Sequence, residues 1–127
     1  MPIFAQMNEK QKTGSEGEAE AVKHLRAKGF EILETNWRFG QEEIDIIARD
    51  KAFLVIAEVK TRSTSYFGEP ETFVNKKKQA HLIKAANAYI EKNNLNLEVR
   101  FDIVSVLKNG DSYKVHLIQN AFYPLVK

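Results

Sequence analysis

The sequence predicts an α/β domain in which a mixed β-sheet is flanked by helices. Two helical patterns alternate with runs of apolar residues, in the order helix, three strands, helix, two strands. The strand-like runs are apolar enough for a buried sheet, and turn residues separate them. At 127 residues the chain is long enough for one compact core but not for two. We therefore predict a single domain over residues 14–127, preceded by a flexible tail at residues 1–13.

The first helix is predicted from about residue 15 to residue 28. One stripe of this helix carries Glu18, Val22, Leu25 and Gly29, and the glycine ends it. Ser15 followed by Glu18 fits a capping box, which would explain the glutamate structurally. In the other interpretation, Glu18 leans from the helix over a site on the sheet. The residues alone leave both interpretations open.

The remaining elements follow from periodicity and turn chemistry. Strands are predicted at residues 30–38, 99–107 and 113–118, the last two joined by a turn at Asn109 and Gly110. The second helix is predicted to begin after the N-cap residue Asn75 and to end near residue 93. Asp102 interrupts an apolar strand, and we interpret it as a brace of the sheet, paired with Arg100 or with a cation on a helix, and not as a catalytic residue. The three histidines fit no ligand spacing with one another, so we treat them as structural.

The central stretch, residues 44–61, reads as two apolar strands joined by a tight turn at Asp50 and Lys51. Side chains alternate along a strand, so Glu58 and Lys60 point to the same side, about 6 to 7 Å apart. With a two-residue loop, Asp45 lies diagonal to Glu58, and Glu43 lies opposite it. Ile44 and Ile46 are then predicted on the apolar face. A longer turn or a bulge would change these relationships.

Diagonal neighbours in a sheet are about 7 to 8 Å apart at the backbone, so the carboxylates of Asp45 and Glu58 can converge on one ion. Two acidic groups this close repel each other, and a hard divalent cation is the usual compensation. A lysine such as Lys60 beside that cation suits phosphodiester hydrolysis, since it can position the attacking water and neutralise charge. The structural alternative is an edge hairpin with solvated charges and a surface contact between Glu58 and Lys60. Spacing alone does not separate the two.

The order of Asp45, Glu58, Val59 and Lys60 resembles the signature of the PD-(D/E)xK nuclease superfamily. The similarity extends to further motifs along the chain, and it covers about residues 14–122: GEAEAVKHLRAKGFEIL at 17–33, NWR at 36–38, EIDIIARD at 43–50, EVKTR at 58–62, KQ at 78–79 and RFD at 100–102. Together these motifs resemble the YraN-like family of small bacterial predicted endonucleases, which is related in fold to archaeal Holliday junction resolvases. Glu42 departs from the family pattern, which usually has glycine before E-I-D.

The resemblance implies a restriction-endonuclease-like core and Mg²⁺-dependent cleavage of DNA, with Mn²⁺ as a substitute. It implies Asp45 and Glu58 as metal ligands, Lys60 as the residue that serves the water, Glu18 as an auxiliary acid, and Gln79 as a supporting contact. Relatedness to junction resolvases further implies a branched DNA substrate and a homodimer.

Two segments are candidates for holding the nucleic-acid backbone. The polar stretch 61–72 is predicted to be a loop beside the site, where Arg62 and Thr64 would contact phosphates. Lys76, Lys77 and Lys78 crowd the start of the second helix, where an anion is favoured by free N–H groups. The simpler interpretation of both segments is that they are solvated.

Composition narrows the function classes. The formal net charge is only +2, so nucleic-acid binding has to come from local patches. The chain has no cysteine and no apolar run long enough for a membrane span, so we expect a cytoplasmic protein with no membrane partner. A non-catalytic DNA-binding or DNA-repair accessory module is the alternative to the nuclease, and a protein-interaction domain is a third interpretation.

Overall fold

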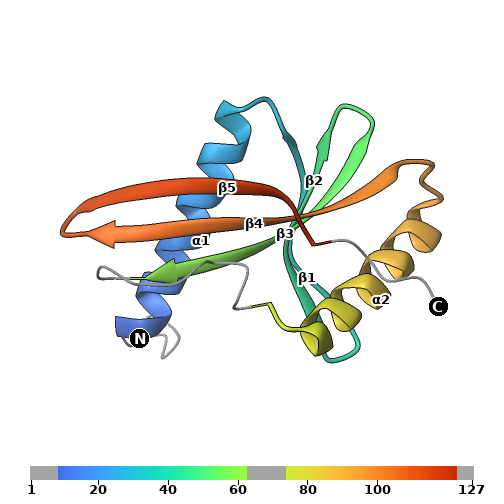
Figure 1. The fold of residues 1–127 in the computed structure, drawn as a ribbon, viewed down its shortest axis with the longest axis horizontal. Helices are drawn as coiled ribbons and strands as arrows, with labels where there is room; N and C mark the ends of the chain where they lie inside the picture. The colour runs from blue at the N-terminus through green and yellow to red at the C-terminus, as the bar shows by residue number, and fades with distance from the viewer. Residues whose placement is uncertain (1–8, 63–73, 123–127) are drawn as a thin grey trace, which may run out of the picture.

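The computed structural model describes residues 9–62 and 74–122, and its elements follow the predicted order (Figure 1). The elements are α1 (Glu9–Ala27), β1 (Glu31–Phe39), β2 (Glu42–Asp50), β3 (Phe53–Arg62), α2 (Lys76–Asn93), β4 (Glu98–Asn109) and β5 (Ser112–Phe122). The strands form one sheet in the order β1-β2-β3-β4-β5, with β3 and β4 parallel and every other pair antiparallel. The predicted α/β fold with a mixed sheet is confirmed, and it is consistent with a resolvase-like core.

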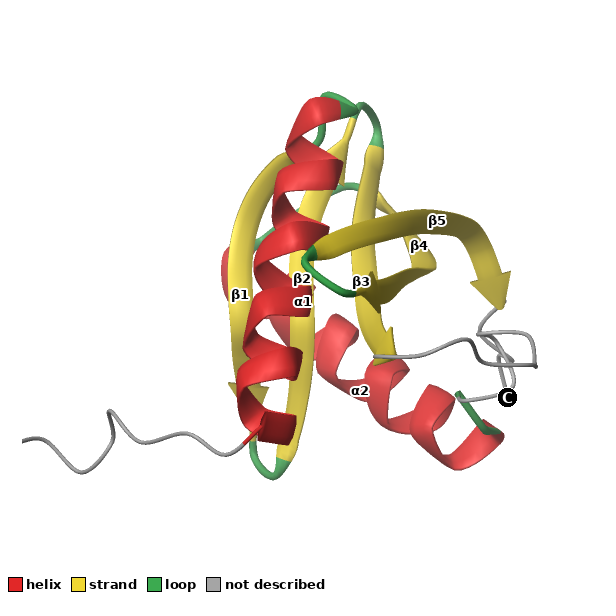
Figure 2. Cartoon of the chain, turned by 90° about the vertical axis from the view of Figure 1, so that its left-hand side faces the viewer, coloured by secondary structure: helices red, strands yellow, loops and turns green. Residues whose placement is uncertain are grey.

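The two helices pack on different faces of the sheet (Figures 1 and 2). We call them the α1 face and the α2 face. Ala21 and Leu25 of α1 pack against a buried cluster on the α1 face formed by Ile46, Ala48, Val55, Ala57, Val104 and Val106. Leu82, Ala86 and Tyr89 of α2 pack against a cluster on the α2 face formed by Ile44, Ile47, Leu54, Ile56, Phe101 and Ile103. Both faces of the central strands are therefore buried, which explains their apolar sequences.

Helix α1 begins earlier than predicted. It starts at Glu9, so Ser15 and Glu18 both lie inside the helix and cannot form a capping box at its start. The preceding stretch contains glutamate, lysine and glutamine, which favour helix and extend it. The structural explanation of Glu18 as part of a capping box is therefore wrong. By contrast, Asn75 is the N-cap of α2 as predicted, and its side chain accepts a hydrogen bond from Lys78 N at 2.8 Å.

The hairpin between β2 and β3 turns one residue later than predicted. Asp50 pairs with Phe53, so Lys51 and Ala52 form the loop, and Lys51 takes a φ of 57°. Asp50 stays in the strand, where its carboxylate accepts a hydrogen bond from Arg100 Nη1 at 2.9 Å. The predicted register, with the loop at Asp50 and Lys51, is therefore wrong. Each residue of β2 thus pairs with a β3 residue two positions further along than predicted. A shift by two keeps the side chains of the paired residues on their predicted faces, and Glu58 and Lys60 still point to the same side of β3.

Asp102 is fully buried and its carboxylate accepts hydrogen bonds from Arg100, one of the two kinds of partner predicted from the sequence. Arg100 Nε and Nη2 donate to it at 3.0 and 2.9 Å, and Asn120 N donates at 3.1 Å. The guanidinium also lies over the rings of Phe30 and Phe53, 5.5 and 5.1 Å from their centroids. These contacts tie β4 to the β2–β3 hairpin and to the start of β1, so Asp102 braces the sheet.

Gly17 allows α1 to approach the end of β3. A Cβ at this position would overlap the Thr61 side chain, whereas a Cβ at Gly14 in the same helix would meet nothing within 4 Å. We expect Gly17→Ala to lower the free energy of unfolding by about 1 to 3 kcal/mol through overpacking. Gly14→Ala is the matched control and should raise it by about 0.5 to 1 kcal/mol, since alanine favours helix. Urea unfolding of both variants measures this, and equal stability of the two would contradict the packing.

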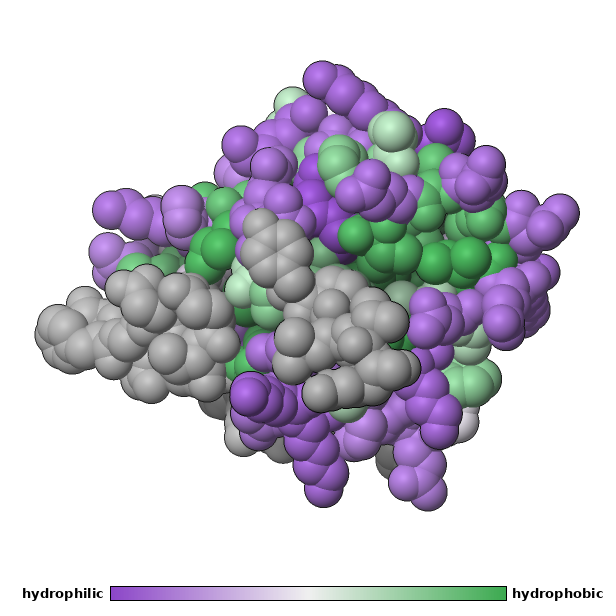
Figure 3. All heavy atoms as spheres, turned by 45° about the vertical axis from the view of Figure 1, so that its right-hand side comes forward, coloured by the Kyte–Doolittle hydropathy of each residue, from purple (hydrophilic) through white to green (hydrophobic). Residues whose placement is uncertain are grey.

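Most of the surface seen in Figure 3 is hydrophilic, and an apolar area interrupts it. Among the large apolar side chains that the structure describes, only Phe39 is exposed, and its ring stacks on Trp37 with the centroids 6.4 Å apart. Within the described residues, neither helix has the length and apolar character needed to cross a membrane.

Candidate active site

The site lies where β2 and β3 separate. Their last paired residues are Ile46 and Ala57, and beyond this pair the two strands diverge (Figure 1). Val59 N donates a hydrogen bond to Asp45 Oδ2 at 2.8 Å. The backbone N–H of Val59 thus donates to the side chain of Asp45 and not to a backbone carbonyl of β2. Asp45 is therefore fixed in the fork between the two strands, directly beside Glu58.

A backbone irregularity in β1 accompanies the fork. Thr35 pairs with Ile46 and Trp37 with Ile44, but Asn36 has a φ of 53° in the middle of the strand. Such a left-handed conformation interrupts regular pleating. Ile44 accordingly packs on the α2 face and Ile46 on the α1 face. The prediction that both share one face is wrong, because the alternation breaks at Asp45.

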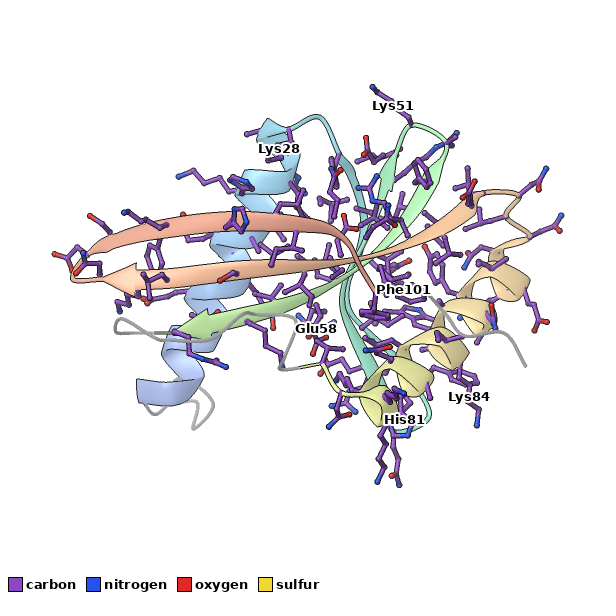
Figure 4. All side chains as sticks on the ribbon, in the orientation of Figure 1. Lys28, Lys51, Glu58, His81, Lys84 and Phe101 are labelled. Atoms are coloured by element: carbon purple, nitrogen blue, oxygen red, sulfur yellow. The ribbon has the colours of Figure 1, made fainter. Side chains whose placement is uncertain are left out.

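Glu58 is the most enclosed acidic group of the site, with 5% of its surface exposed. Its Oε2 lies 3.7 Å from Lys60 Nζ and 3.4 Å from Lys78 Nζ. Its Oε1 is buried and has no hydrogen-bond partner among the residues that the structure describes. Figure 4 shows Glu58 between the sheet and the start of α2. One oxygen of this carboxylate is therefore balanced by two lysines, while the other is left for a ligand.

The acidic groups of the site influence one another. Burial and the negative charge of Glu58 raise the pKa of Asp45 to about 7, although the Val59 N–H opposes the shift. Burial also raises the pKa of Glu18, against a hydrogen bond from Asn36 that lowers it, and the charges of Glu43 and Glu58 add to the rise. Glu18 on α1 therefore belongs to the same electrostatic cluster as Asp45 and Glu58.

The residues present suit a hard divalent cation that takes few protein ligands. Among residues 9–62 and 74–122, no group of at least three acidic, histidine or cysteine side chains is arranged to hold a metal by itself. Mg²⁺ typically uses one or two carboxylates and completes its shell with waters and substrate phosphates. The free Oε1 of Glu58 and the adjacent carboxylate of Asp45 match that requirement. They do not match a closed zinc cage.

The other predicted site residues lie in different surroundings. Gln79 donates from its side-chain amide to Val74 O at 3.0 Å, so it fixes the chain that enters α2. Lys76 and Lys77 are exposed at the start of α2. Arg62 is the last residue of β3 and not part of a loop, and its Nη1 donates to Thr61 O. Thr64 lies outside the described residues, as does most of the predicted loop.

Two contributions to the site were not predicted from the sequence. Lys78 was assigned only to phosphate binding, but its ammonium pairs with Glu58. Asn36 was assigned no role in the site, although it is a hydrogen-bond partner of Glu18. An asparagine in the middle of an otherwise regular strand was the available signal, since asparagine tolerates the left-handed conformation better than most residues.

The comparisons with known proteins give the family. Residues 17–106 match the Uncharacterised protein family UPF0102, which is the YraN-like group that the motifs resembled. The chain belongs to this family. It is 48% identical over 117 residues to a UPF0102 protein of Christiangramia forsetii, with 92% of this chain and 98% of the relative covered. A UPF0102 protein of Acetivibrio thermocellus is 46% identical over 122 residues, with 91% and 94% covered. The predicted membership of the YraN-like family is thus confirmed, and the matched segment contains Glu18, Asp45, Glu58, Lys60 and Gln79.

Proposed function

We propose that this UPF0102 protein is a metal-dependent endonuclease that hydrolyses phosphodiester bonds in DNA. The observation that carries the proposal is the buried Oε1 of Glu58, which lacks a hydrogen-bond partner among the described residues, in a side chain close enough to Asp45 to raise its pKa. Burying a carboxylate oxygen without a partner is costly unless a ligand uses it. The nearby Lys60 adds the group that phosphodiester hydrolysis needs at the attacking water.

Asp45 and Glu58 would hold Mg²⁺, or Mn²⁺ in its place. A bound divalent cation supplies activation of water and neutralisation of negative charge on the phosphate. Two features of the chain support this assignment. Asp45 cannot turn away easily, because its Oδ2 is held by Val59 N, and Glu58 is confined between β3 and α2. The ligand oxygens are therefore preorganised, which limits the reorganisation that binding requires.

Lys60 and Lys78 divide the positive charge of the site between two elements. Lys60 extends from β3, and we assign its ammonium the positioning of the attacking water. Lys78 comes from the first turn of α2, where N–H groups also favour an anion, so it is suited to the phosphate. Gln79 supports this arrangement through its hydrogen bond to Val74 O. Glu18 approaches from α1 as an auxiliary acid, and Lys76 and Lys77 extend the positive charge along α2.

Branched DNA as the substrate and a homodimer as the active form are further parts of this proposal. They are supported by the resemblance to junction resolvases, since the cutting of paired strands requires two active sites. A monomeric enzyme would instead cut single strands or nick a duplex.

Cleavage of a DNA panel tests the proposal. Duplex, single-stranded, flap and four-way-junction DNAs of one sequence are incubated with the protein in Mg²⁺, in Mn²⁺ and in EDTA. We expect cleavage in either metal, none in EDTA, and the highest rate on a branched DNA. Folded protein that binds these DNAs but cuts none of them would favour the accessory module, and absence of binding at low salt would favour the protein-interaction domain.

A further inference from the structure

The far halves of β3, β4 and β5 carry a group of basic side chains on the α2 face. The register places Lys60 beside Ser105, and Ser105 beside His116. The next row on the same face places Arg62 beside Leu107, and Leu107 beside Lys114. We call Lys60, Arg62, Lys114 and His116 the basic face. Its first residue, Lys60, follows Glu58 on the same face of β3, so the basic face is continuous with the proposed active site.

Alternation along the strands concentrates these cations on one side. The intervening residues of the same strands lie on the α1 face: Val104 and Val106 belong to its buried cluster, and Val59, Val115 and Leu117 pack against that cluster, partly buried. Lys114 and His116 consequently point away from α1, and both are exposed. In the rows from Glu58 to Arg62, Glu58 is the only acidic side chain that the described strands place on this face. Its charge is already balanced by Lys60 and Lys78.

The described helices leave this part of the sheet open on the α2 face. Helix α2 packs against β1, β2 and the first halves of β3 and β4, whereas the ends of β3 and β4 and the start of β5 extend away from it (Figures 1 and 2). Helix α1 lies behind these strands in Figure 1 and covers only the other face. Within the described chain, Lys114 and His116 are exposed and Lys60 and Arg62 are half-buried, so a large ligand can reach this face along β5.

We propose that the basic face binds the sugar-phosphate backbone of the DNA that continues beyond the cleavage site. This inference rests on the proposed function, because the position of the cut phosphate sets where the backbone continues. Cations follow one another every second residue, about 6 to 7 Å apart along β3, and neighbouring strands are about 4.8 Å apart. The face thus offers lysine and arginine charges and a histidine N–H donor in two parallel rows. A repeating polyanion fits these rows better than a single small anion does.

Binding of a 20-base-pair DNA duplex, measured by fluorescence anisotropy in EDTA from 50 to 300 mM salt, tests the basic face without requiring catalysis. The test variant is Lys114→Ala/His116→Ala, which removes exposed side chains only. The control is Lys28→Ala/Lys51→Ala, because both lysines are exposed and lie outside the basic face, Lys28 just after α1 and Lys51 in the β2–β3 loop (Figure 4). We expect the test variant to bind about 10-fold more weakly at 50 mM salt. The slope of log K against log salt should fall in magnitude by about 1 to 2, because a protein that makes fewer phosphate contacts releases fewer counterions when it binds. The control should stay within about twofold of the wild type.

The outcomes separate this inference from the nuclease proposal. Equal affinity and salt slope in the test variant and the wild type would overturn the basic face, even if the protein cleaves DNA. Absence of duplex binding by the wild type at 50 mM salt would overturn it as well. A selective loss of binding in the test variant, in a protein that cleaves nothing in any metal, would support the basic face and contradict only the nuclease.

Discussion

Replacing Lys60 with alanine is expected to lower kcat for DNA cleavage by about 10² to 10⁴-fold. The ammonium lies 3.7 Å from Glu58 Oε2, which places it at the edge of the proposed cation site. A group that transfers or orients a proton in the transition state typically contributes an effect of this size. The fold should survive, because Glu58 keeps its contact with Lys78 and the Lys60 side chain is partly exposed. DNA affinity should fall only modestly, as for the loss of one phosphate contact.

Single-turnover cleavage of the best DNA of the panel measures this effect, with thermal unfolding as the check on folding. Lys84→Ala is the matched control, because it removes an exposed lysine from the surface of α2. It should cleave at the wild-type rate. A Lys60→Ala protein within about threefold of wild type in kcat would remove Lys60 from the chemistry and leave it a surface partner of Glu58.

Replacing Asp45 with asparagine is expected to stabilise the metal-free protein at pH 8. Burial and Glu58 raise the pKa of Asp45 from 3.8 to about 7, so the folded state resists ionisation of this carboxyl. Asparagine has nearly the same shape, keeps an oxygen for the Val59 N–H and carries no charge. The gain in the free energy of unfolding has an upper limit of about 4 kcal/mol, from 1.36 kcal/mol for each pKa unit.

The pH dependence gives the sign of this effect. Because the folded pKa of Asp45 is above the unfolded value, the folded state binds more protons between pH 4 and pH 7. The free energy of unfolding of the wild type, minus that of Asp45→Asn, should therefore be most positive below about pH 4. This difference should fall as the pH rises and be lost once the pH exceeds about 7. Urea unfolding in EDTA at pH 5 and pH 8 measures the difference. Asp111→Asn, in the exposed turn before β5, is the control and should show no such change. A variant less stable than wild type at pH 8 would contradict the predicted repulsion.

The sequence was sufficient for the parts of the fold that depend on local patterns. Alternation alone placed Glu58 and Lys60 on one side of β3, where their side chains form an ion pair. Capping chemistry placed the start of α2 at Asn75, whose side chain accepts from Lys78 N. These relationships involve neighbours in sequence, so short-range geometry determines them.

The parts that sequence reasoning missed depend on contacts between distant segments. The β2–β3 loop lies at Lys51 and Ala52 because Arg100, from β4, holds Asp50 in the strand. The left-handed Asn36 and the fork at Asp45 depend on β1, β2 and β3 meeting at one point. The pairing of Lys78 with Glu58 requires the position of α2 over the sheet. None of these contacts leaves a periodic signal in the sequence.

The proposed nuclease activity depends on a divalent-cation site formed by Asp45 and Glu58. Thermal unfolding at pH 8, with Mg²⁺ or Mn²⁺ titrated into wild type and Asp45→Asn, tests it most directly. A cation that binds only the folded protein adds about 2.7 kcal/mol of stability at a concentration 100 times its Kd. We expect the melting temperature of the wild type to rise with metal concentration and saturate, while that of Asp45→Asn stays nearly constant. A metal-independent melting temperature in the wild type, or the same rise in both proteins, would contradict the site.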